Sequence, residues 1–125
     1  MRAFACKFLL MSTKPVVASF CATFLAAEMR HVYRQIHGLQ TFEPVILTHK
    51  RRNAGDFPFP DESIVTLPRP LTRELRRFWF RRVRHSPWPI YRSEVRAIES
   101  VLRERKAQLL HIWFGHIGMH MVPLL

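Results

Sequence analysis

The sequence has few cysteines and no long hydrophobic run. Cys6 and Cys21 are the only cysteines and form no C-x-x-C pair, so a disulfide framework is not expected and a reducing compartment is favoured. No run of about 18 apolar residues occurs, so no membrane span is predicted. Residues 1–14 contain a short apolar run without a small-residue cleavage site before Lys14-Pro15, and we expect a disordered N-terminal extension there, not a signal peptide.

Acidic residues are also scarce. There are 9 Asp and Glu against 20 Lys and Arg, which gives a net charge of +11. This excess does not identify a fold, but it predicts attraction to polyanions: nucleic acid, phosphate-bearing substrates or an anionic membrane face. Hydrophobic residues make up 48% of the chain and charged residues 23%, so a folded domain, or a piece of a larger one, is expected.

Strand-like and helix-like segments alternate along the chain. Four short apolar runs predict strands at residues 16–20, 45–48, 64–67 and 109–114. Apolar residues at helical spacing predict helices between them, over residues 23–39, 71–83 and 91–102, and another that begins at Met119. Thr23 is expected to cap the first helix, and Gly38 to close it in a left-handed conformation. The pattern predicts an α/β fold: a Rossmann-like parallel sheet with flanking helices over residues 15–125.

Ligands of parallel sheets bind outside the carboxyl ends of the strands, which makes the segments after residues 20, 49, 67 and 114 informative. Two of them resemble segments of a known family. Thr23-Phe24-Leu25-Ala26-Ala27-Glu28 is similar to the S-E-T-F-I-x-x-E segment of many group-1 glycosyltransferases with the GT-B fold. His111-Ile112-Trp113-Phe114-Gly115-His116 is similar to their H-x-H-F-G/A segment. The resemblance covers about residues 15–125.

The resemblance implies an incomplete N-terminal half of a GT-B fold, the part that holds the acceptor. In the intact enzyme a hexose would pass from a nucleotide diphosphate sugar to a saccharide or lipid-linked acceptor. The donor-binding domain would follow residue 125, so the chain alone is expected to be inactive. No metal and no other cofactor are implied, because the fold arranges dipoles and basic residues around the diphosphate.

The resemblance also implies a set of site residues. Thr23, Phe24, Glu28 and Gly115 correspond to acceptor-binding positions, and His111 to a catalytic one. Trp113 occupies the place of the second histidine in the family's segment, and we hypothesise that His116 replaces it. Other interpretations stay open: Thr23 as a helix cap, Glu28 as a partner of the helix dipole, and His111 as a hydrogen-bonded core residue. The pair His116 and His120 has no third ligand, so no metal site is expected.

Residues 69–84 combine arginines with aromatic residues. Seven arginines and one acidic residue, Glu74, surround Phe78, Trp79 and Phe80. Three interpretations are open: a solvated face whose apolar stripe packs on the sheet, an interfacial helix on an anionic membrane, or a nucleic-acid-binding surface. The second predicts a cytoplasmic protein peripheral to the inner face of the membrane, with contacts from Arg73, Arg76, Arg77, Trp79 and Arg81. The third supplies the alternative function, a small basic module that binds nucleic acid.

Overall fold

The structure is a computed structural model, and it describes residues 14–26, 29–85, 92–113 and 118–124. Four parallel strands form one sheet in the order β3-β2-β1-β4. The strands are β1 (Val16–Phe24), β2 (Glu43–Arg51), β3 (Ile64–Thr66) and β4 (Ala107–Ile112). The α-helices are α1 (Arg30–His37), α2 (Arg73–Trp79) and α3 (Arg92–Glu104). Three shorter helical segments are the 3₁₀ helices η2 (Asp61–Ser63) and η4 (Met119–Leu124) and the π-helical turn η3 (Phe80–Arg84).

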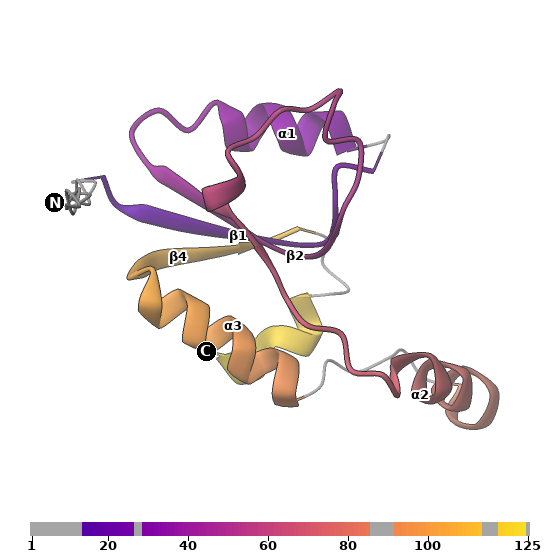
Figure 1. The fold of residues 1–125 in the computed structure, drawn as a ribbon. Coiled ribbons are helices and arrows are strands. Elements are labelled where there is room, and N and C mark those ends of the chain that lie inside the picture. The colour runs from indigo at the N-terminus through magenta and orange to yellow at the C-terminus, as the bar shows by residue number, and fades with distance from the viewer. Residues whose placement is uncertain (1–13, 27–28, 86–91, 114–117, 125) are drawn as a thin grey trace, which may run out of the picture.

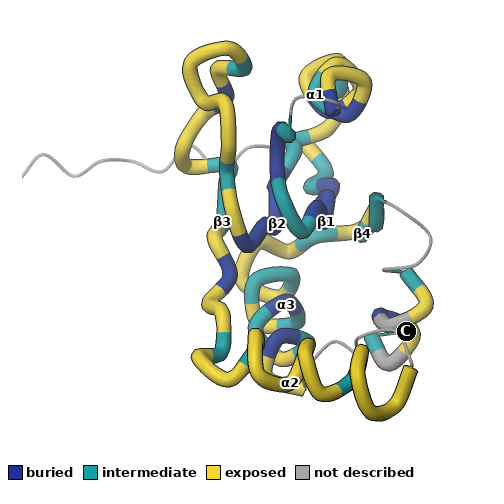
Figure 2. The backbone as a smooth tube through the Cα atoms, turned by 90° about the vertical axis from the view of Figure 1, so that its right-hand side faces the viewer, coloured by how far each residue is buried: buried dark blue, intermediate teal, exposed yellow. Residues whose placement is uncertain are grey.

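Helices cover both faces of the sheet (Figure 1). α1 lies on one face, and α3 and η4 lie on the other. Under α1 the core contains Cys21, Val32, Ile36, Ile46 and Phe59. The opposite core contains Phe20, Val45, Leu47, Ile98 and Met121. The central strands β1 and β2 are buried between these layers (Figure 2), which explains their continuous apolar runs. The expected α/β fold, a Rossmann-like parallel sheet with flanking helices, is confirmed.

The first strand is longer than the sequence indicates, and this overturns one prediction. Thr23 is still part of β1, where it pairs with Lys50 of β2, so it does not cap a helix. The strand ends in a tight turn in which Leu25 has a positive φ of 66°. The side-chain amide of Asn53 donates to the Leu25 carbonyl at 2.9 Å and holds this turn. α1 therefore begins only at Arg30, without a side-chain cap.

The first helix ends where it was predicted to end, but Gly38 does not have the predicted conformation. Gly38 follows α1 directly, but its φ of −74° is right-handed. Its N–H donates to the Arg34 carbonyl at 3.0 Å, so the last turn closes as ordinary helix. A left-handed residue is not needed there.

α2 and η3 form a continuous helical segment that projects from the body (Figure 1). It ends at His85, which has a left-handed φ of 49°. Four of its apolar side chains, Leu75, Phe78, Trp79 and Val83, are exposed, as is Leu71 just before α2, while Phe80 is partly buried. The interpretation in which this stripe packs on the sheet is therefore wrong. The physical reason is that α3 and η4 already cover the nearby face, through Ile98 and Met121.

The two edges of the sheet differ. β3 has three residues and is followed closely by Pro68 and Pro70. β4 has six residues and contains no Asp, Glu, Lys or Arg, and its Leu109 is 57% exposed. Within the described residues β4 has β1 as its only partner strand. One edge is thus short and limited by proline, while the other is longer and apolar.

In the described part of the chain, no helix has the length and apolar character that crossing a membrane requires.

Candidate functional site

The two segments that resemble the glycosyltransferase family start from neighbouring strands. β1 and β4 are parallel and adjacent, with Phe20 opposite Ile112, and the Trp113 N–H donates to the Phe20 carbonyl at 3.1 Å. Parallel neighbours end at the same edge of a sheet. Trp113, which follows β4, therefore leaves the sheet from the same edge as Leu25, which follows β1. We call this the carboxyl edge.

Thr23 and Phe24 lie at the carboxyl edge but have different surroundings. Thr23 is partly buried, whereas Phe24 is fully buried and packs edge-on against Phe59, with ring centroids 5.9 Å apart. The Phe24 side chain is thus a core residue. An acceptor at this edge would meet Thr23 and the backbone around it.

His111 lies in β4 beside an apolar cleft. Its imidazole stacks on the Trp113 ring, with centroids 4.3 Å apart and planes 26° from parallel. Both rings line a cleft of about 450 Å³ between α1 and the β1–β4 side of the sheet, together with Ser19, Gln35, Leu39 and Leu109. The His111 side chain is exposed, so the interpretation of His111 as a buried, hydrogen-bonded core residue is wrong.

Three residues of the expected site, Glu28, Gly115 and His116, lie outside the described residues, as does Phe114. The structure therefore places Thr23 and His111 on adjacent strands and leaves the placement of the other three untested. The indole Nε1 of Trp113 is buried and has no hydrogen-bond partner among the described residues.

Thr48 joins the ends of β1 and β2. Its side chain is fully buried. The hydroxyl oxygen Oγ1 accepts a hydrogen bond from the Phe24 N–H at 3.1 Å and lies 3.1 Å from the Lys50 carbonyl, to which the hydroxyl donates. These bonds satisfy backbone groups at the point where the regular pairing of β1 with β2 skips Ala22. The carboxyl edge is thus fixed by a side chain as well as by the sheet.

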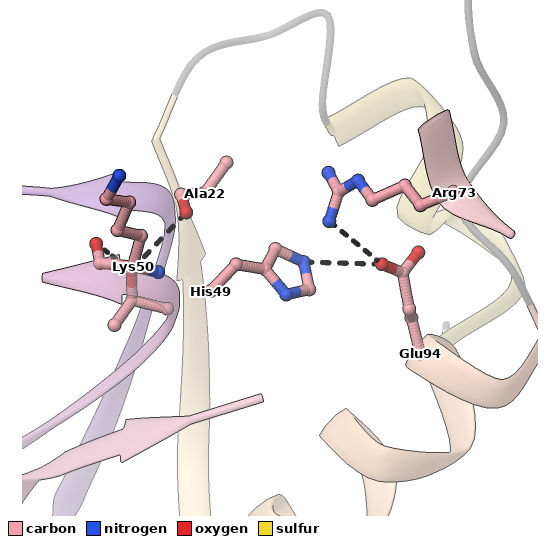
Figure 3. A network of polar contacts seen from close by, with 6 residues as sticks. Ala22, His49, Lys50, Arg73 and Glu94 are labelled. Carbon is pink, nitrogen blue, oxygen red and sulfur yellow. Dashed lines mark hydrogen bonds and ion pairs between the residues drawn. The ribbon is translucent and has the colours of Figure 1, made fainter. Parts of the chain in front are cut away.

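A buried ionic network, which the sequence did not predict, involves His49, Glu94 and Arg73 (Figure 3). His49 of β2 points toward Glu94 of α3, and Arg73 of α2 approaches the same carboxylate. Nε2 of His49 is 3.4 Å from Oε1 of Glu94, and a guanidinium nitrogen of Arg73 is 3.4 Å from the same oxygen. His49 and Glu94 are buried, with 9% and 4% of their surfaces exposed.

Burial lowers the pKa of His49, and the nearby Arg73 guanidinium lowers it further, against the opposing effect of Glu94. His49 is therefore neutral at pH 7, and its ring can donate one N–H to the carboxylate. The carboxylate in turn balances the charge of Arg73. The network ties together the end of β2, the start of α3 and the start of α2.

One sequence signal could have identified Glu94. Position 94 precedes Ile98 by four residues and Val101 by seven, so it lies on the apolar stripe of its helix, where an acidic residue is out of place. A carboxylate in such a position is expected to have a buried polar partner. The identity of the partner could not be read from the sequence, because His49 is 45 positions earlier in the chain.

Basic residues lie at the end of β2 and directly after it, at the carboxyl edge. Lys50 and Arg52 are exposed, while Arg51 is paired with Asp61 and donates to the Phe59 carbonyl at 3.2 Å. Exposed cations here can attract a phosphate-bearing ligand. Arg51, in contrast, serves mainly to hold the loop that precedes β3.

The arginines expected to contact a membrane or another anion gather on the projecting segment. Arg76, Arg77, Trp79 and Arg81 are exposed, and Arg73 is partly buried in the network with Glu94. The structure thus divides the expected set into one residue that anchors α2 and four that face solvent. They lie away from the cleft beside His111.

Among residues 14–26, 29–85, 92–113 and 118–124, no cluster of three or more His, Cys, Asp or Glu side chains could hold a metal ion. No protein-family model matches the chain, and neither a curated protein nor a solved structure matches it significantly.

Proposed function

We propose that the chain is the acceptor-side part of a glycosyltransferase of the GT-B type. The reaction would transfer a sugar from a nucleotide diphosphate sugar to a saccharide or lipid-linked acceptor. One observation carries the proposal: the two motif-bearing segments leave adjacent parallel strands, β1 and β4, at the same edge of the sheet. Segments on opposite edges could not line one acceptor groove.

The carboxyl edge offers groups suited to this reaction. An acceptor hydroxyl attacks the anomeric carbon, the bond from that carbon to the diphosphate oxygen breaks, and the acceptor loses its proton. Thr23 can hydrogen-bond an acceptor hydroxyl, and the exposed His111 imidazole can accept a hydrogen bond or a proton. Lys50 can attract a phosphate-bearing acceptor or the diphosphate. Orientation of the hydroxyl by such groups supplies much of the rate in transfer reactions.

We further propose that the protein acts at the inner face of the cytoplasmic membrane, where a lipid-linked acceptor is found. The nucleotide sugar would be bound mainly by a second domain. The proposal therefore predicts different affinities for the two ligands. The chain should bind the acceptor, and it should bind the donor only weakly.

An NMR titration of the isotope-labelled chain tests this division. The ligands are a panel of oligosaccharides, a prenyl-diphosphate-linked saccharide in detergent, and a uridine diphosphate sugar. Acceptors are expected to shift the amide signals of Thr23, Lys50 and Trp113, and His111→Ala is expected to weaken that binding several-fold. His37→Ala is the matched control, because His37 is an exposed histidine on α1.

Two results would contradict the proposal. One is the absence of saturable shifts with every acceptor, or shifts confined to the opposite edge near Glu43 and Ala107. The other is binding of the nucleotide sugar that is tighter than binding of any acceptor, which would assign this domain to the donor.

A further inference from the structure

The segment formed by α2 and η3 presents a continuous apolar stripe to solvent. Its members in the helical segment are Leu75, Phe78, Trp79 and Val83, which recur at i+3 and i+4 spacing, and Leu71 in the turn just before α2 continues the same spacing. Their exposed fractions run from 46% at Trp79 to 102% at Leu71. Single exposed apolar residues are common, but a contiguous exposed stripe marks an interaction site. We call this stripe, with the arginines that border it, the α2–η3 surface.

Arginines cover much of the rest of the segment. At helical spacing Arg73, Arg76, Arg77, Arg81 and Arg84 fall on the opposite arc, while Arg82 falls on the stripe side. The Arg84 guanidinium lies 5.5 Å from the centre of the Trp79 ring, at the margin of the stripe. Glu74 is the single acidic residue of this part of the sequence. The surface therefore combines an apolar layer with a dense cationic border.

The α2–η3 surface is held at one end and open along its length. Arg73 fixes the start of α2 to Glu94 of α3, and the Arg73 N–H donates to the Pro70 carbonyl at 3.0 Å. Beyond this anchor the segment projects from the sheet, and α1 lies on the far face (Figure 1). The stripe is thus accessible to a partner with an extended surface.

We propose that the α2–η3 surface docks on an anionic lipid bilayer with its helix axis in the membrane plane. Leu75, Phe78 and Trp79 would enter the boundary between headgroups and acyl chains, and the arginines would bind lipid phosphates. A second copy of the chain is a poor occupant, because it would bring one arginine border against another. Nucleic acid complements the arginines but offers no apolar layer for the stripe. Lipid binding is independent of sugar transfer, so either can fail without the other.

Vesicle partition of the full chain tests the charge requirement. We expect binding to phosphatidylcholine vesicles that contain about 30% phosphatidylglycerol, at about 0.15 M salt, and little binding to pure phosphatidylcholine. Arg77→Gln/Arg81→Gln should weaken partition about 30-fold, the ratio that corresponds to about 1 kcal/mol for each basic residue near the surface. The matched control, Arg30→Gln/Arg34→Gln on α1, removes the same charge from exposed positions and should change partition less than about threefold.

A second pair of variants tests the apolar requirement. Phe78→Ser should weaken partition about tenfold or more, whereas Phe42→Ser, at an exposed phenylalanine before β2, should not. Lipids brominated on their acyl chains should quench tryptophan fluorescence, and Trp79→Phe should remove most of that quenching. All substituted side chains are exposed, so far-UV circular dichroism should confirm unchanged folding.

Three outcomes would overturn the proposal. The first is equal loss of binding in the α2–η3 variants and their controls, which would indicate a general effect of net charge. The second is equal binding to neutral and anionic vesicles, or none to either. The third is tight, salt-resistant binding to RNA or DNA without vesicle binding, which would support the nucleic-acid-binding module instead.

Discussion

His49 and Glu94 meet inside the protein, with Nε2 of the imidazole 3.4 Å from Oε1 of the carboxylate. The contact joins the end of a central strand to the first turn of α3, and Arg73 extends it to α2. The carboxyl edge, the projecting segment and the helix under the sheet are therefore mechanically connected. A change in the protonation state of His49 therefore affects the contact that holds these three parts together.

The free energy of unfolding is expected to fall as pH decreases below 6.5, the ordinary value for imidazole. Burial lowers the pKa of His49 in the folded state, so between the two values the unfolded chain binds more protons, and acid favours unfolding. The slope attributable to this one group is at most about 1.4 kcal/mol per pH unit. Urea denaturation at a series of pH values measures it.

His49→Gln should remove this component of the slope, and His37→Gln, at an exposed position, should leave it in place. An unchanged slope in the His49 variant would mean that another group is responsible for the acid sensitivity.

Glu94→Gln should lower the free energy of unfolding by about 1–3 kcal/mol, because the amide cannot balance the Arg73 charge in a buried position. Glu99→Gln is the matched control on the same helix. Its carboxylate pairs with Arg103 at 2.6 Å, but the pair is exposed, so the expected change is below about 0.5 kcal/mol. Urea denaturation compares the two variants, and equal losses would contradict a special role for Glu94.

Thr48→Val should increase hydrogen exchange at the Phe24 amide, because the variant has no oxygen to accept that hydrogen bond. The side-chain shape is kept, and the expected cost of the unsatisfied N–H is about 1–3 kcal/mol. Thr48→Ser keeps the hydroxyl and should retain slow exchange. Amide exchange followed by NMR distinguishes them, and fast exchange in both variants would show that the bond is not what protects this amide.

Cys21 should react with a disulfide reagent only when the protein unfolds. Its side chain is fully buried, and burial raises the pKa of the thiol to about 12. At pH 8 about one thiol in ten thousand is therefore ionised, and the thiolate is the reactive form. A Cys6→Ser variant isolates the signal of Cys21, and its rate of labelling with and without denaturant is the measurement. Rapid labelling of the native protein would contradict this burial.

The central strands were predictable from the sequence because the middle parts of β1 and β2 are buried on both faces and are therefore mostly apolar. The position at which β1 ends was not predictable. Thr23 and Phe24 fit a strand and also fit the first turn of a helix, so local pattern cannot decide between them. Their pairing with Lys50 and Arg51 decides it, and that contact comes from a distant part of the chain.

The candidate site was likewise only partly predictable from the sequence. The alternation of strands and helices predicted that Thr23 follows the first strand closely and that His111 lies in the fourth. The register, which could not be predicted, puts His111 opposite Ser19, four residues before Thr23. The network of His49, Glu94 and Arg73 depends on three separate segments, and no local signal specifies such a meeting. The exposure of the apolar stripe on α2 could not be predicted for a similar reason. An amphipathic pattern shows that a helix has an apolar side, but not whether that side packs on the sheet or on a partner.

Because its two edges differ, the sheet can accept an additional strand more readily beside β4 than beside β3. β3 is short and runs into prolines, which cannot donate to a neighbouring strand. β4 has no Asp, Glu, Lys or Arg that would repel an incoming strand, and its outer row of backbone donors and acceptors can serve as a template. An added strand, from whatever polypeptide, would therefore lengthen the sheet beyond β4, on the side where His111 and Trp113 stand, and would form a new wall of their cleft.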